Sequence, residues 1–203
     1  MTDCLIVGVG GQGTVLASRL IGNAAIARGL AVRGSETIGM AQRGGSVASH
    51  LRMGGEIDSP LISPGGADVI LAFEPCEAAR ALPYLKPDGV MIVCDRAVQP
   101  AGSPGYDARE MIGGLRLAVR RLYVLDGERI TASCGARCLN VAILGAAIEC
   151  GAIPCSMEDI EKALEARFDK RRSEMNKAAL RLGASMARAG GEERKHGGRH
   201  GHD

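Results

Sequence analysis

The sequence predicts one α/β domain in which a mainly parallel sheet is flanked by helices and the C-terminal region is helical. Three observations support this class. Short apolar runs bounded by glycine and proline alternate with helical segments, which is the pattern of strand–helix–strand units. The first run, Cys4 to Val7, leads directly into a Rossmann-like glycine turn and then into helical spacing. From about residue 139 onward, the periodicity is helical only.

Length and composition limit the function classes. The chain has 203 residues, which fits a single α/β domain, and 46% of them are apolar. Aromatic residues make up only 2%, with no tryptophan, which argues against the stacking surface that single-stranded nucleic acid requires. The net charge is +2, from 25 basic and 23 acidic residues, so we expect neither nucleic acid nor membrane as a partner.

Compartment and redox state follow from the N-terminus and the cysteines. No apolar stretch approaches the roughly 20 residues of a membrane helix, and the first apolar run stops at Gly8, so we expect no targeting signal. The seven cysteines are odd in number and scattered, and several lie in apolar runs. We therefore expect reduced thiols buried in the core of a cytoplasmic protein.

The predicted elements follow the chain in order. Strands are expected at residues 4–7, 30–34, 46–53, 67–73, 90–94 and 122–125, the last as an edge strand. Helices are expected at residues 12–28, 75–82, 139–150, from Ser156 as N-cap through 168, and 175–186, with a weakly helical stretch at 106–121. We expect residues 1–189 to form the domain, and the charged, histidine-rich tail 190–203 to be disordered.

The glycine turn is the first candidate site. Its residues are Gly8, Gly10, Gly11, Gln12 and Gly13. The spacing matches a dinucleotide fingerprint, and Glu36 follows the second strand where a ribose-binding acid would lie, so an NAD- or FAD-binding protein is one reading. The other is a turn that packs, or that touches a different ligand, with Gln12 offering an amide donor and acceptor at the helix start.

A second glycine-rich segment faces the same crevice. Arg43, Gly44 and Gly45 lie in a polar loop at the edge where the strands' carboxyl ends are expected. An arginine among glycines suits a carboxylate, phosphate or pyrophosphate, although a solvated turn has the same composition. Their position at the ligand edge favours a binding role.

Other reactive residues do not assemble into a recognisable set. The cysteines at 134 and 138, and at 150 and 155, lack the partners of a zinc or iron–sulfur site, so we expect no metal here. His50 has no visible nucleophile partner and is interpreted as structural. Asn140, at the start of an apolar helix, either caps backbone or reaches a neighbour. No triad, carboxylate pair or P-loop lysine emerges, which indicates that the chain does not carry chemistry by itself.

Two motifs together carry a family resemblance. The stretch from Gly8 to Leu20 and the stretch Gly34-Ser-Glu-Thr-Ile-Gly-Met-Ala-Gln-Arg-Gly-Gly-Ser46 resemble the gamma-type subunits of 2-oxoacid:ferredoxin oxidoreductases. The second is most similar to the small (beta) subunits of indolepyruvate ferredoxin oxidoreductases. Asn140 to Gly145, and Asn176-x-x-Ala179-x-x-x-Gly183, are also similar. The resemblance spans about residues 4–186.

This resemblance implies a subunit of an oxygen-sensitive enzyme of anaerobic metabolism that is inactive alone. A large partner subunit would bind thiamine diphosphate and magnesium and carry the iron–sulfur clusters, while this chain would bind no cofactor alone. The complex would oxidatively decarboxylate an arylpyruvate, form the acyl-coenzyme A, and reduce ferredoxin. The two glycine segments, with Glu36 and Arg43, would dock on the large subunit and contact coenzyme A or close the site. A non-catalytic binding subunit remains the alternative beside the NAD or FAD protein.

Overall fold

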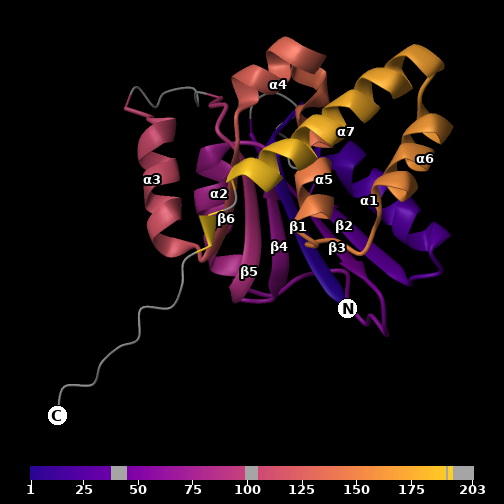
Figure 1. Cartoon of the computed structure of the whole chain (residues 1–203). Helices are drawn as coiled ribbons and strands as arrows, with labels where there is room; N and C mark the ends of the chain where they lie inside the picture. The colour runs from indigo at the N-terminus through magenta and orange to yellow at the C-terminus, as the bar shows by residue number, and fades with distance from the viewer. Residues whose placement is uncertain (38–44, 99–104, 191, 194–203) are drawn as a thin grey trace.

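The computed structural model describes residues 1–37, 45–98, 105–190 and 192–193 of the chain. Within this part, seven strands form one sheet in the order β2-β3-β1-β4-β5-β6-β7 (Figure 1). The strands are β1 (Thr2–Val9), β2 (Val32–Thr37), β3 (Ser46–Met53), β4 (Ala67–Ala72), β5 (Leu85–Cys94), β6 (Arg121–Leu125) and β7 (Glu192–Glu193).

The predicted mainly parallel sheet is confirmed, and within it β3 and the short β7 run opposite to the other strands. β1 pairs in parallel with β4, β4 with β5, and β5 with β6. β3 is antiparallel to both β1 and β2, so β2 runs in the same direction as β1 but is separated from it by β3. The two-residue β7 is antiparallel to β6. The glycine turn therefore follows a strand in the middle of the sheet.

Helices cover both faces of the sheet (Figure 1). The helices are α1 (Thr14–Ala27), α2 (Pro75–Ala81), η1 (Leu82–Tyr84), α3 (Ala108–Ala118), α4 (Gly127–Cys134), η2 (Ala136–Cys138), α5 (Leu139–Glu149), α6 (Met157–Arg167) and α7 (Lys170–Gly190). α2 and α3 pack on one face, and α1, α5 and their neighbours pack on the other. Among the described residues no single helix is long and apolar enough to span a membrane; only 127–134 joined to 136–149 across a 115° bend passes by length and composition.

Alternation along the strands explains this three-layer arrangement. In β1, Cys4 and Ile6 enter the cluster beneath α1 and α5, whereas Leu5 and Val7 enter the cluster beneath α2 and α3. All four side chains are buried, as expected of a strand covered on both faces. A continuous apolar run therefore indicates a central strand.

Glycines allow α5 and α7 to cross closely. A Cβ at Gly145 would lie 1.8 Å from the carbonyl oxygen of Leu180, and one at Gly183 would lie 1.8 Å from the carbonyl oxygen of Ala142. Each helix thus packs its backbone against a glycine of the other. α5 is buried along nine of its residues, as its uniform hydrophobicity predicts.

Several predicted boundaries are wrong for identifiable reasons. β5 begins at Leu85, well before the predicted start at residue 90, because the strand includes Pro87 and Gly89, which are typical of turns. α4 is absent from the predicted elements because it is short and has few buried residues; Asp126 is its N-cap. β6 is not the outermost strand, because residues 192–193 of the predicted tail form β7; residue 191 and residues 194–203 lie outside the described residues.

Candidate functional site

The glycine turn closes the carboxyl end of β1, and the side chain of Gln12 braces it. The Gln12 Oε1 accepts a bond from the Val9 N–H at 2.7 Å, and its Nε2 donates to the Phe73 carbonyl at 3.2 Å. A Cβ at Gly8 would lie only 2.8 Å from that Oε1. Both ends of the amide are therefore engaged within the protein, and the small size of Gly8 makes room for them.

Gly13 holds the turn against α5. It has φ 86°, a conformation that glycine adopts without strain, and a Cβ there would lie 2.4 Å from the Nδ2 of Asn140. Asn140 is 3% exposed; its Nδ2 lies 3.4 Å from the Gly13 carbonyl oxygen, and its Oδ1 accepts from the Val141 N–H. Of the two roles considered for Asn140, reaching a neighbour and bonding local backbone, the structure shows both.

A cavity of about 520 Å³ lies over this turn, and we call it the turn cavity. Gly11 opens into it: φ is 96°, and a Cβ there would meet no atom within 4 Å. The lining residues come from the segments that follow β1, β4 and β5, from the start of α1, and from η2 and the start of α5. They are Gly11, Gln12, Gly13, Leu16, Phe73, Arg96, Ala97, Val98, Ala136, Arg137, Leu139 and Asn140. The expected ligand edge of the sheet is thus hollowed.

Two arginines supply positive charge to the turn cavity. Arg96 follows β5 and Arg137 lies in η2, and both are exposed. Such guanidinium groups, beside an open glycine backbone, suit an anionic group such as phosphate or carboxylate. Sequence reasoning missed both. Arg96 follows the predicted strand 90–94 at the carboxyl edge where ligands are expected, and that position was the available signal. Arg137 follows α4, which is absent from the predicted elements.

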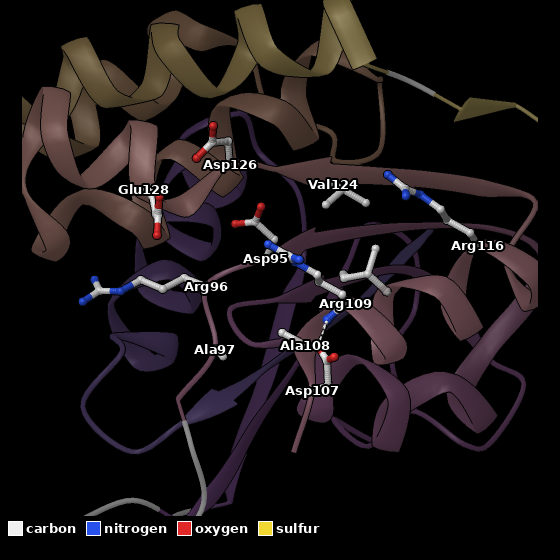
Figure 2. A pocket seen from close by; sticks show the side chains of 11 residues that line it. Asp95, Arg96, Ala97, Asp107, Ala108, Arg109, Arg116, Val124, Asp126 and Glu128 are labelled. Carbon is white, nitrogen blue, oxygen red and sulfur yellow. Dashed lines mark hydrogen bonds between the residues drawn. The ribbon is translucent and has the colours of Figure 1, made fainter. Parts of the chain in front are cut away.

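A second cavity of about 880 Å³ adjoins the first and shares Arg96 and Ala97 with it (Figure 2). Its charges are mixed. The carboxylates follow β5 and β6 or lie on α4 and at the start of α3, and the cations follow β5 or lie on α3. The charged lining residues are Asp95, Arg96, Asp107, Arg109, Arg116, Asp126 and Glu128.

Asp95, which lines this second cavity, has a raised pKa. Partial removal from water raises its pKa above the usual value, and the nearby carboxylates of Asp126 and Glu128 add to the rise. A bond of 2.8 Å from the Gly127 N–H, at the start of α4, acts in the opposite direction. The acid therefore ties the end of β5 to α4.

The predicted second glycine segment is only partly described. The Gly45 carbonyl oxygen accepts from the Gly10 N–H at 2.9 Å, which brings the two glycine segments together at this edge. Arg43 and Gly44 lie outside the described residues. Glu36 lies in β2 and pairs with Ser49 of β3, so two strand spacings, or roughly 10 Å, separate it from β1. Glu36 does not line the turn cavity.

The remaining candidates are packed into the protein. The Nδ1 of His50 accepts from the Ile62 N–H at 3.1 Å, and burial lowers the pKa of this imidazole. All seven cysteines are free thiols, and burial raises the pKa of Cys4 far above its usual value. Among the described residues, no group of three His, Cys, Asp or Glu side chains is arranged to hold a metal ion.

The fold and this site define a Rossmann-like α/β protein whose braced glycine turn borders an arginine-lined cavity. The comparisons then give its family. The family model described as pyruvate ferredoxin/flavodoxin oxidoreductase matches residues 3–186, and the chain belongs to that family. The predicted resemblance to gamma-type subunits is thereby confirmed, and the extent predicted for it agrees closely with the match.

The chain matches curated relatives over nearly the whole length of both proteins. The chain is 36% identical to indolepyruvate oxidoreductase subunit IorB of Archaeoglobus fulgidus, over 93% of this chain and 96% of that protein. It is 32% identical to the subunit of the same name from Thermococcus kodakarensis, over 92% and 96% of the two chains.

Solved structures share the fold. The gamma subunit of a keto/oxoacid ferredoxin oxidoreductase from Geobacter sulfurreducens matches with TM-score 0.71 and 24% identity, over 94% of this chain and 98% of that one. The 2-oxoglutarate:ferredoxin oxidoreductase of Magnetococcus marinus, solved with 2-oxoglutarate, coenzyme A and succinyl-CoA bound, matches with TM-score 0.71 and 20% identity. That match covers 93% of this chain but 31% of the longer chain.

Proposed function

We propose that this chain is the small subunit of an indolepyruvate or other arylpyruvate ferredoxin oxidoreductase and is inactive alone. The observation that carries the proposal is the 36% identity to an indolepyruvate oxidoreductase subunit across 93% of this chain and 96% of that relative. The complex oxidatively decarboxylates the 2-oxoacid to an acyl-coenzyme A and reduces ferredoxin. The seven free cysteines are in keeping with a cytoplasmic enzyme.

In this proposal the large subunit holds thiamine diphosphate, magnesium and the iron–sulfur clusters. Thiamine diphosphate supplies the carbanion chemistry, and the protein orients and shields the reacting groups. This chain contributes the carboxyl edge of its sheet as one wall of the site. The shape of the turn cavity is fixed by Gln12 and Asn140, whose side-chain amides are hydrogen-bonded to backbone groups.

Coenzyme A is the co-substrate that the turn cavity fits best. Its phosphates are anionic, and the cavity offers Arg96, Arg137 and the open backbone at Gly11. The structurally similar enzyme from Magnetococcus marinus was solved with coenzyme A bound, which supports this choice. Arg43 of the 36–45 segment is proposed as a further anion contact.

Co-expression with a large thiamine-dependent subunit tests the function. Anaerobic affinity purification should give a brown complex that reduces ferredoxin when indolepyruvate and coenzyme A are both present. A colourless chain that binds NAD tightly and ignores the large subunit would instead establish the dinucleotide alternative. If this chain binds the large subunit but the large subunit is equally active without it, the chain is a non-catalytic binding subunit.

Arginine variants in the complex test the coenzyme A contact. For Arg96→Ala and Arg137→Ala we expect KM for coenzyme A to rise about tenfold, because each loses a charge-assisted bond to phosphate. The matched control is Arg181→Ala, an exposed arginine of α7 paired with Glu161. Unchanged coenzyme A kinetics in both cavity variants, with cluster content intact, would remove these arginines from the contact.

A further inference from the structure

Two buried acids lie directly after β4, beside the glycine turn. Glu74 is 1% exposed and Glu77 is 6% exposed, and neither was predicted as a site residue. A carboxyl group removed from water to this degree is retained only where donors satisfy its oxygens. The donors therefore indicate what the acids hold in place.

The donors come from two distant parts of the chain. The Tyr106 hydroxyl donates to Oε1 of Glu74, and the Ser46 hydroxyl donates to Oε2 of Glu77. The Glu77 N–H donates to Oε2 of Glu74 at 3.1 Å and joins the two acids. We call these four residues, Ser46, Glu74, Glu77 and Tyr106, the acid clamp. Burial and the bond to Glu74 raise the pKa of the Tyr106 phenol.

The acid clamp is also joined to the glycine turn on both sides. Phe73, next to Glu74 in sequence, accepts the Nε2 bond of Gln12. Gly45, next to Ser46, accepts the N–H of Gly10. Short bonded steps therefore connect Tyr106 to Gly10 through two buried carboxyls, although the two residues are far apart in sequence.

We propose that the acid clamp fixes the chain at 45–46 and at 105–107 against the glycine turn, with Glu74 and Glu77 as positioning residues. The face so fixed is the one that meets the large subunit, and this last clause rests on the proposed function. Glu74 is the N-cap of α2 and Glu77 lies in its first turn, where the free N–H groups of a helix favour negative charge. The four residues form one connected network, because the Glu77 N–H bonds the Glu74 carboxyl while each carboxyl also accepts from one of the two hydroxyls.

Hydrogen exchange of the full chain tests the clamp without the partner. For Tyr106→Phe we expect the Gly10 N–H to exchange about tenfold faster, because the loss of one charge-assisted bond is transmitted to the glycine turn. The control is Tyr84→Phe, which removes a hydroxyl at the opposite edge of the sheet, where the Tyr84 ring packs edge-on against His50. Faster exchange confined to residues around 106 would overturn the proposal.

Two further variants guard against simple unfolding. Glu74→Gln keeps the shape of the side chain but leaves only one acceptor oxygen for the Tyr106 and Glu77 donors. It should reproduce the faster exchange at Gly10, and combining it with Ser46→Ala should give less than the sum of the two effects. Additive effects would show that the residues act independently and would overturn the clamp.

Affinity for the large subunit tests the positioning role. Tyr106→Phe should weaken binding about tenfold, while Tyr84→Phe stays within twofold of the native chain. Coupled exchange with unchanged affinity would overturn the role at the partner face. If the native chain forms no complex at all, the proposed function fails, and the exchange measurements still decide the clamp.

Discussion

At the scale of single residues, the glycine turn combines backbone conformation with side-chain room. Gly11 and Gly13 both have positive φ, but only Gly13 faces a neighbour at close range. A substitution at Gly11 therefore introduces backbone strain alone, whereas one at Gly13 adds a steric clash. The sequence shows the spacing of the glycines. It does not show that Asn140, 127 residues further along, occupies the space beside Gly13.

Substitution at these two glycines is the first prediction. Gly11→Ala should cost about 1 kcal/mol, since its Cβ meets only open space and backbone strain is the sole penalty. Gly13→Ala should cost about 2–4 kcal/mol, because its Cβ must also displace the Asn140 amide. Urea denaturation of both variants measures the difference. Equal costs would show that Asn140 moves aside freely.

The second prediction concerns His50 and pH. Burial lowers the pKa of His50 below its ordinary value of 6.5, and its Nδ1 must stay unprotonated to accept from Ile62. As the pH falls below about 6.5, the unfolded chain takes up the proton first, so the folded state loses stability by up to about 1.4 kcal/mol per pH unit. Above that pH the contribution is constant.

Denaturation midpoints between pH 7.5 and 5.5 test this. His50→Gln cannot titrate but keeps an acceptor for Ile62, so its stability should vary less over the window. An equal slope in both proteins would assign the pH dependence to other groups.

At the scale of elements, periodicity predicted strands and helices well where one face is polar. β3 was placed at 46–53 with its observed bounds, because its apolar and polar residues alternate. Ser156 is the N-cap of α6 as predicted, and together with Asp159 it forms a capping box. Arg28 on α1 adds a bond to Asp159, and the pKa of that acid falls to about 2, mainly because Ser156 donates to it.

Other elements carried no such local signal. α4 is short, and only Gly127, Ile130 and Cys134 of it are buried, too few to define a stripe. The first half of β5 contains Pro87 and Gly89, which are turn formers, and its register with β4 shifts there. The acid clamp was missed because Glu74 and Glu77 resemble ordinary helix-start residues until their burial is known.

The crossing of α5 and α7 gives the third prediction. Gly145→Ala or Gly183→Ala places a Cβ where a backbone carbonyl lies, so each should cost about 3 kcal/mol or more. Gly113→Ala, in α3 with no atom within 4 Å of its Cβ, should instead stabilise the fold by about 0.5–1 kcal/mol. Thermal and urea unfolding test all three. Mild effects at 145 and 183 would mean that the helices separate without penalty.

At the scale of the whole molecule, the sequence predicted the class and the ligand edge, but not the order of the strands. Local periodicity does not predict that the antiparallel β3 lies between β2 and β1, because the order of strands depends on which strand edges pair once the chain has turned. That order carries Glu36 away from the turn cavity. The fingerprint and its acid, adjacent in a linear reading, are thus separated by a strand.

The domain boundary gives the fourth prediction. α7 ends at Gly190, and β7 adds only two paired positions to β6. A chain shortened after Gly190 should therefore unfold within about 1 kcal/mol of the full chain, because few contacts are lost. Circular dichroism melts of both forms check this. A loss of several kcal/mol would show that residues 191–203 belong to the domain.

The glycine contact between α5 and α7 has a consequence for the distant cavity. Asn140 lies on the same helix as Gly145, so the rotation and depth of α5 set where that amide meets the turn. α7 never touches the turn cavity, yet it supports the helix that forms part of the cavity's lining. Under the proposed function, a replacement at Gly183 would therefore change the affinity for coenzyme A from a distance, through a displaced helix and not through contact with the ligand.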